Sequence, residues 1–208
     1  MKSFRSLSVA AVLASILFAP LGFSALINVT GDGSILGNAP NRVGNNNATN
    51  TEQWGFNEQQ GVLLTTDLAV DGGSIPAGTR VDSHMIFLNL RLASQLDSLS
   101  TRASWSFSGI ILGVMSDNEG TLEAASNSLL GATGTFYPGS FNNRGMENND
   151  RYLGVGTSVL GVRMNVTQPG DWIRVVTRSA AVPDAGSSLA LFAMALGALM
   201  AFGRRSQR

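Results

Sequence analysis

The sequence predicts an all-β protein, a two-sheet sandwich of jelly-roll-like type, because three features coincide between its two ends. Short β-branched runs alternate with Asn, Asp, Gly and Ser, which interrupt strands and form turns. Strand signals recur at intervals of roughly ten residues, a spacing that favours a sandwich over an alternating α/β fold. No repeat of about 20 to 50 residues is visible, so a solenoid or propeller is not expected.

Five strands are expected in the central part of the chain. Residues 162–167 alternate apolar and polar side chains with a period of two, as in a strand with one buried face. The turn residues Gln168–Asp171 lead into a second run, Trp172–Thr177. We predict that these two runs form a hairpin with Ile173 and Val162 facing the core. The other expected strands are Val62–Val70, Val81–Leu90 and Ala103–Val114.

Composition limits what the central domain, residues 25–181, can do. It contains nine Arg, no Lys and thirteen acidic residues, so it carries about four net negative charges. No extended basic patch is implied, and nucleic acid is therefore not expected as a partner. The chain has no Cys, which excludes a disulfide framework, a thiolate metal site and a Cys nucleophile. No cofactor is expected.

Residues 1–24 have the pattern of a secretory signal peptide. Positive charge precedes the apolar run Val9–Phe18, which is too short for a permanent bilayer anchor. Gly22 and Ser24 supply small side chains at the −3 and −1 positions, so cleavage is expected after Ser24. The general secretion machinery is then the first partner, and the alternative is an uncleaved anchor helix.

Residues 182–208 combine three features in a fixed order. A short turn-prone motif precedes an apolar helix, predicted over residues 187–202, and a cationic cluster ends the chain. The motif consists of Val182, Pro183, Asp184, Ala185 and Gly186, and the cluster of Arg204, Arg205 and Arg208. The helix is short for a membrane span at a rise of about 1.5 Å per residue. Its terminal arginines would remain on the cytoplasmic side, so the central domain would face outward.

This tail resembles the PEP-CTERM class of sorting signals, and more closely its VPDSG variant, with Ala185 at the position where the variant usually has Ser. The resemblance implies that an exosortase, a membrane-embedded cysteine transpeptidase-like enzyme, recognises the tail and removes it near the motif. It implies an inner-membrane intermediate, followed by release or attachment at the cell surface or beyond. A simple C-terminal membrane anchor is the alternative. Residues 81–88, 106–114 and 169–177 are similar to segments of cargo proteins of the same sorting class, which implies no activity.

The Asn-rich segment 38–50 is expected to be a mobile loop or an N-terminal arm. His84, the only His, shares a strand face with Asp82, but no Ser-His-Asp arrangement follows from the local spacing. We therefore expect His84 to be structural or exposed. Trp54 lies in a polar stretch and is a candidate for stacking on a sugar ring, whereas Trp105 and Trp172 are expected to pack within strands.

Glu147 and Asp150 are candidates for calcium ligands. They lie in an Asn-rich loop, and Ca²⁺ takes six to eight oxygen ligands. The spacing is not that of an EF-hand, and Arg144 and Arg151 could neutralise the two acids instead.

Three functions remain open for the central domain. The first is a non-catalytic structural or interaction role at the cell surface or in the extracellular matrix, and no enzymatic activity is expected. The alternative is a carbohydrate- or exopolysaccharide-binding module, which an exposed aromatic platform would favour. The third is a small secreted hydrolase, which clustered acids at the bottom of a cleft would favour.

Overall fold

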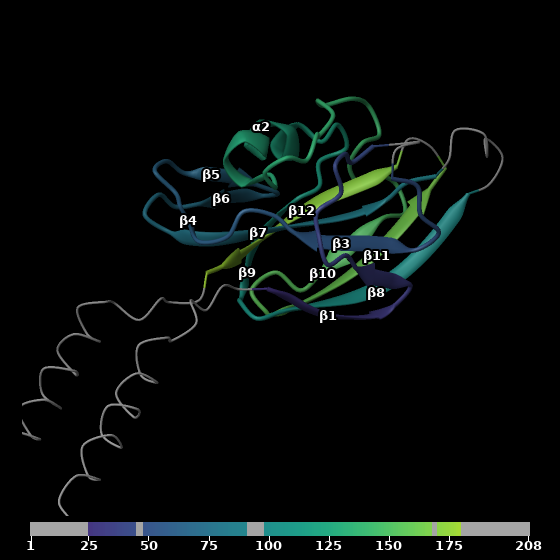
Figure 1. The fold of residues 1–208 in the computed structure, drawn as a ribbon, viewed down its shortest axis with the longest axis horizontal. Coiled ribbons are helices and arrows are strands. Elements are labelled where there is room, and N and C mark those ends of the chain that lie inside the picture. Colours follow the sequence, from purple (N-terminus) through teal and green to yellow (C-terminus); the bar gives the residue numbers. More distant parts are fainter. Residues whose placement is uncertain (1–24, 45–47, 91–97, 168–169, 180–208) are drawn as a thin grey trace, which may run out of the picture. The chain divides into compact units, whose positions relative to one another are not determined.

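β-Strand is the predominant regular structure of the described chain, arranged in several antiparallel sheets with one short helix, which confirms the mostly-β prediction (Figure 1). The computed structural model describes residues 25–44, 48–90, 98–167 and 170–179, which belong to one compact unit. The predicted signal peptide 1–24 and sorting tail 182–208 lie outside the described residues. Within the described part, no helix is long and apolar enough to cross a membrane.

The elements follow one another as a series of mostly short strands. In chain order they are β1 (Leu26–Gly31), β2 (Gly33–Ile35), β3 (Gln53–Asn57), β4 (Val62–Leu63), β5 (Leu68–Val70), β6 (Gly73–Ile75), β7 (Arg80–Leu88), β8 (Leu99–Phe107), β9 (Ile111–Met115), α2 (Thr121–Leu130), β10 (Arg151–Leu153), β11 (Val159–Val166) and β12 (Asp171–Arg178).

The strands form two main sheets. The smaller sheet has the order β1-β8-β11-β10, and all its neighbours are antiparallel. The larger sheet has the order β2-β3-β7-β12-β9, with β4 also paired to β7, and only its β2–β3 pair is parallel. β5 and β6 pair with each other as a separate ribbon.

The two main sheets share a hydrophobic core. β7 and β12 contribute Ile86 and Ile173, and the smaller sheet contributes Trp105 and Val162. The Trp105 ring lies so close to β3 that a Cβ at Gly55 would approach it to 2.6 Å, so β3 requires a glycine there. The Trp105 Nε1–H donates to Gln53 Oε1 at 2.9 Å, which satisfies the indole within the core.

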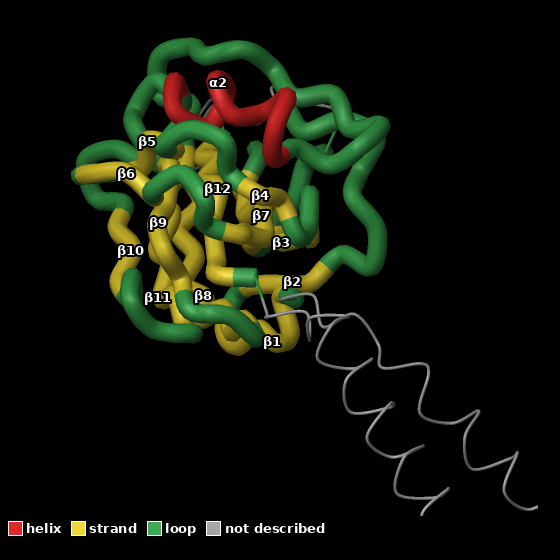
Figure 2. Tube along the Cα trace, turned by 90° about the vertical axis from the view of Figure 1, so that its left-hand side faces the viewer, coloured by secondary structure: helices red, strands yellow, loops and turns green. Residues whose placement is uncertain are grey.

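The larger sheet is covered on its other face as well. Helix α2, the β5–β6 ribbon and neighbouring loops lie across it (Figure 2). Alternate residues of β7 and β12, such as Met85, Phe87 and Trp172, are buried beneath this layer. β7 and β12 are therefore buried on both faces, which explains why Val81–Leu88 is almost entirely inaccessible.

The predicted hairpin of residues 162–167 and 172–177 is wrong. β11 pairs with β8 and β10, whereas β12 pairs with β7 and β9, so the connection between them passes from one sheet to the other. Turn residues limit the backbone angles of a connection but do not determine which strand pairs with which. The prediction that Ile173 and Val162 face the core together is confirmed, because both belong to the shared core.

Two other predicted strands are each divided in the structure. Val62–Val70 contains β4 and β5, and Ala103–Val114 contains parts of β8 and β9, which belong to different sheets. Breaks of three or four residues separate the halves, at residues 64–67 and 108–110. The apolar pattern of a single segment does not show where the chain leaves one sheet and enters another.

The Asn-rich segment, where described, packs against the larger sheet and is not a free arm. Val43 is buried against its outer face, and Asn50 donates from Nδ2 to the Phe87 carbonyl at 3.1 Å. The Asn89 N–H donates in turn to Asn50 Oδ1 at 2.6 Å. The Asn50 side chain thus pairs with backbone groups at the end of β7, as a neighbouring strand would. The Asn-rich composition of the segment did not predict this contact.

Candidate functional site

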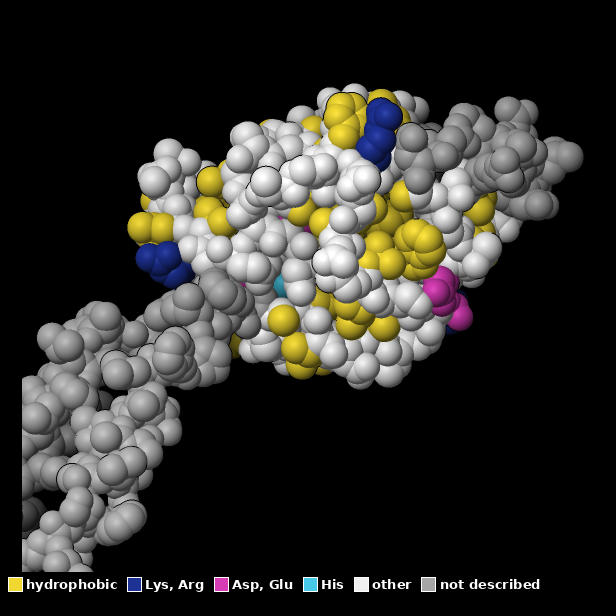
Figure 3. All heavy atoms as spheres, in the orientation of Figure 1, with side chains coloured by type: hydrophobic (Ala, Val, Ile, Leu, Met, Phe, Trp, Pro, Cys, Tyr) yellow, Lys and Arg dark blue, Asp and Glu magenta, His cyan; other side chains and the backbone are white. Residues whose placement is uncertain are grey.

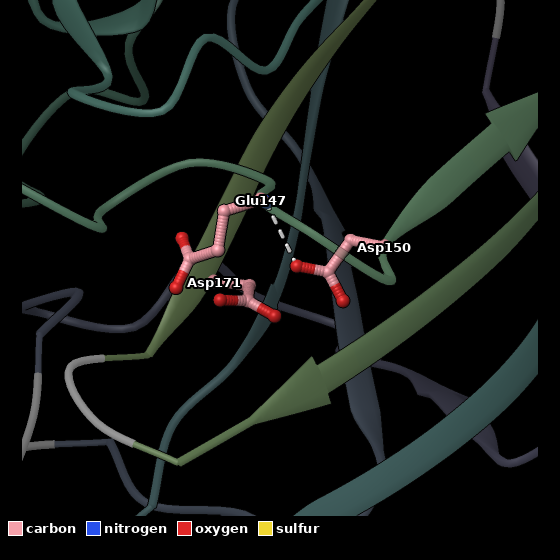
Figure 4. A group of neighbouring side chains, drawn as sticks. All are labelled: Glu147, Asp150 and Asp171. Carbon is pink, nitrogen blue, oxygen red and sulfur yellow. Dashed lines mark hydrogen bonds between the residues drawn. The ribbon is translucent and has the colours of Figure 1, made fainter.

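Three carboxylates gather where the chain crosses between the two sheets. Glu147 and Asp150 lie in the loop before β10, and Asp171 is the first residue of β12. One oxygen from each lies within 4.8 Å of the others, and the Asp171 carboxylate lies between the other two (Figure 4). We call these residues the carboxylate cluster. The sequence predicted Glu147 and Asp150 as candidates but missed Asp171, which only the crossover from β11 to β12 brings to them.

Hydrogen bonds position Asp150 but leave the rest of the cluster short of donors. Asp150 Oδ1 accepts from the Asn165 N–H at 2.7 Å, and its Oδ2 accepts from the Glu147 N–H at 2.9 Å. Asp171 is only 2% exposed, and its Oδ2 has no hydrogen-bond partner among the described residues. Glu147 Oε2 is likewise buried without a partner there. Buried carboxyl oxygens of this kind need a donor, a bound proton or a cation.

The electrostatics of the cluster are unfavourable to three negative charges. Burial, together with repulsion from Asp150 and Glu147, raises the pKa of Asp171 to about 9, and a hydrogen bond from the backbone of Asn165 opposes the rise. Burial also raises the pKa of Glu147 and of Asp150; for Asp150, two backbone N–H groups and the charge of Arg163 oppose the rise. Among the described residues, no arginine forms a salt bridge with the cluster. Arg144, which the sequence offered as an alternative partner of these acids, pairs with Glu123 instead.

A second group of charges lies on the smaller sheet. Arg151, Arg163 and Arg102 stand directly opposite one another on β10, β11 and β8. We call them the arginine row. They line a hollow of about 310 Å³, together with Ala103, Leu153, Gly161 and Val162. Ala103 and Val162, the neighbours of Arg102 and Arg163, point into the core, so the alternation of strand side chains directs the row to the outer face.

The arginine row is a concentration of positive charge without internal compensation. Like charges directly opposite on neighbouring strands are destabilising. In the part of the chain that the structure describes, none of the three arginines forms a salt bridge. Gly161 leaves the floor of the hollow open, since a Cβ there would meet nothing nearer than the Leu153 carbonyl at 3.9 Å. Leu153 is 74% exposed and adds an apolar surface beside the charges. The hollow can thus contact an anion and an apolar group together.

A third group of charges is buried beneath α2 and is structural. Arg174 of β12 donates to Glu58 Oε2 and Oε1 at 2.7 and 2.8 Å, and to the Glu123 carbonyl at 2.7 Å. Glu123 of α2 also pairs with Arg144. All four side chains are almost completely inaccessible. These contacts hold the helix on the larger sheet.

The other candidate residues lie inside the fold. His84 is fully buried, with its ring nitrogens 2.8 Å from Asn57 Oδ1 and 3.0 Å from Thr177 Oγ1. Burial lowers the pKa of His84 to about 3, so the ring is neutral. Trp54 is half-buried and packs edge-on against Phe87, with the two ring centroids 6.1 Å apart, at the edge of the cluster on the outer face of the larger sheet.

The surface view agrees with a domain of low charge density. On the face drawn in Figure 3, the Arg, Asp and Glu side chains of the described residues stand apart, among hydrophobic and uncharged groups. Nucleic-acid binding requires a continuous basic patch, and this face does not carry one.

Comparison with known families identifies the tail. Residues 181–206 match the VPDSG-CTERM motif, which marks the chain as an exosortase-sorted protein. The match implies processing by an exosortase and export to the cell surface or beyond. The predicted sorting motif 182–186 and the cluster of Arg204, Arg205 and Arg208 fall within or beside this match and outside the described residues. No curated protein and no solved structure matches the chain.

Proposed function

We propose that the central domain is a non-catalytic binding module that holds an anionic exopolysaccharide at the cell surface or in the extracellular matrix. The observation that carries the proposal is the arginine row, three cross-strand guanidinium groups around an open hollow without a salt bridge to a described residue. The sorting motif supports the location, because it implies delivery to the surface.

The chemistry of the hollow fits an acidic sugar chain. Guanidinium groups bind carboxylate, sulfate or phosphate oxygens through two parallel hydrogen bonds. The exposed Leu153 side chain offers an apolar contact for the C–H face of a sugar ring. The domain as a whole carries negative charge and would repel an anionic polymer. At physiological salt, however, charges more than about 8 Å apart are largely screened, so the arginines next to a bound polymer segment dominate its electrostatic interaction.

A hydrolase is less well supported. The carboxylate cluster has its central member 2% exposed, and none of its residues lines the hollow. The imidazole of His84 is enclosed within the fold. We classify the two sheets with their shared core as a jelly-roll-like sandwich, an architecture that many lectin domains use, although this analogy of fold does not by itself assign a ligand.

The test is binding of the full chain, purified in detergent, to polygalacturonate, with neutral dextran as the comparison. We expect polygalacturonate to bind and the affinity to fall with salt. Arg102→Gln and Arg163→Gln should each weaken it about ten-fold or more, because each removes a charge-assisted contact. Arg178→Gln, the same change at an exposed arginine of β12, is the matched control. Equal binding of dextran, tighter binding of duplex DNA, or unchanged affinity in both row variants would refute the proposal.

A further inference from the structure

We infer that Glu147, Asp150 and Asp171 form a calcium-binding site that joins the two sheets. This inference does not rest on polymer binding by the arginine row, although the charge of Arg163 acts on Asp150. It rests on the position of the three carboxylates and on the contacts that they lack.

The first support is the Asp171 side chain. It is 2% exposed, its Oδ2 has no partner among the described residues, and it points into the space between Glu147 and Asp150 (Figure 4). A buried carboxylate oxygen without a donor is costly in a folded protein. A cation at the centre of the cluster would satisfy this atom and the buried Glu147 Oε2 together.

The spacing fits one shared ion. The three ligand oxygens lie within 4.8 Å of one another. Calcium binds oxygens at about 2.3–2.6 Å, so two oxygens on opposite sides of one ion are about 5 Å apart or less. The hydrogen bonds from the Asn165 and Glu147 N–H groups hold Asp150 in place before an ion arrives.

The donor set selects the class of metal. All three side chains offer hard carboxylate oxygens, and the chain has no Cys and a single His, which is enclosed elsewhere in the fold. Zinc and copper sites normally include His or Cys, so a hard cation is preferred. Calcium fits better than magnesium, because it accepts irregular shells of six to eight oxygens whereas magnesium requires a near-octahedral one. Water would supply the remaining ligands.

The position of the site gives the ion a structural role. Asp171 begins β12 in the larger sheet, whereas Asp150 precedes β10 and accepts from the N–H of Asn165 in β11, both in the smaller sheet. An ion bound by all three would fasten the sheets together at the β11–β12 crossover.

The experiment is thermal unfolding and calorimetric titration of the full chain in detergent, first in chelator and then with Ca²⁺. At a free Ca²⁺ concentration of about 10 mM, above the 10⁻⁴–10⁻³ M dissociation constants of many extracellular modules, Tm should rise reversibly. A ten-fold excess over Kd corresponds to a rise of roughly 3–6 °C for a chain of this size. Titration should show one ion per chain, and Mg²⁺ should produce a smaller shift.

The variants separate this site from calcium bound elsewhere. Asp171→Asn and Glu147→Gln keep the shape of each side chain and should abolish the calcium-dependent rise in Tm. Glu119→Gln, the same change at an exposed acid outside the cluster, should retain it. The inference is overturned if Ca²⁺ leaves the Tm of the unmodified chain unchanged, a result that does not depend on any variant folding. It is also overturned if a folded Asp171→Asn variant responds to Ca²⁺ as the unmodified chain does.

Discussion

The buried ionic contacts beneath α2 lead to a quantitative prediction for Arg174→Met. Methionine fills much of the same space but removes the guanidinium. The change eliminates two hydrogen bonds to Glu58, at 2.7 and 2.8 Å, and those to the Glu123 carbonyl, Ser126 Oγ and Asn127 Oδ1, at 2.7, 2.6 and 2.9 Å. The helix would then lose its main polar attachment to β12.

The magnitude follows from the carboxylate that remains. The Glu58 side chain is 0% exposed and would keep the Ser83 hydroxyl as a donor, but not its charged partner. Removing one member of a buried ion pair costs about 3–5 kcal/mol, because the other charge is left uncompensated away from water. A domain of this kind has a total stability of about 5–15 kcal/mol, so the loss would be a large fraction of it.

The assay is urea denaturation of the full chain followed by tryptophan fluorescence. Arg178→Met is the matched control, since Arg178 lies at the exposed end of the same strand, and we expect it to change stability by no more than about 0.5 kcal/mol. The double variant Glu58→Gln/Arg174→Met should be more stable than the sum of the two single losses predicts, because it leaves no unpaired charge at Glu58.

Two results would refute this reasoning. If Arg174→Met and Arg178→Met have the same midpoint, the buried pair contributes nothing to the attachment of α2. If the losses in the double variant are simply additive, Glu58 and Arg174 do not interact.

Three further predictions concern the core, the histidine and the tail. Ile173→Ala should cost about 2–5 kcal/mol by urea denaturation, because Ile173 is fully buried between the sheets, and a cost as small as that of Ile27→Ala, at a 58% exposed position, would contradict the core assignment. His84 has a pKa of about 3 in the folded state and 6.5 in the unfolded state. As the pH falls from 6.5 towards 3, the unfolded state takes up a proton that the folded state does not, so the free energy of unfolding decreases by about 1.4 kcal/mol per pH unit. Above pH 6.5, His84 does not make stability depend on pH. The stability of His84→Gln relative to the unmodified chain should therefore rise by about 2 kcal/mol between pH 7 and pH 5, and parallel pH curves would exclude this role. Deletion of residues 182–208 should leave a protein that is exported but neither processed nor sorted, as cell fractionation would show; an intact tail on mature protein from exosortase-containing cells would contradict the processing.

The β-strand content was predictable because the alternation of apolar and polar residues within a short segment indicates a strand. Val162, Met164 and Val166 alternate with polar residues, and the structure buries these three on one face of β11. The partner of that strand was not predictable, because sheet membership depends on contacts far apart in sequence. Helix α2 escaped prediction for another reason. Its buried face carries Glu123 and Ser126, which contact Arg174, so its apolar periodicity is weak.

The candidate sites show the same division. Glu147 and Asp150 are close in sequence and could be singled out from it. Asp171 and the arginine row could not, because the first depends on a crossover between sheets and the second on the register of three strands. Arg163 alone looks like an ordinary exposed residue of an alternating strand. Only its position opposite Arg102 and Arg151 makes it part of a candidate anion-binding site.

The place of β12 in the larger sheet has a mechanical consequence. This strand, Asp171–Arg178, is the last described element before the sorting motif, and it is hydrogen-bonded to β7 on one side and β9 on the other. If the mature protein is held to a surface polymer through its C-terminal end, tension from flowing liquid enters the fold through this central strand. Two ladders on opposite sides must then yield together before the strand can leave the sheet. A tether attached at that end would therefore pull on a strand that is hydrogen-bonded on both sides, not on an edge strand.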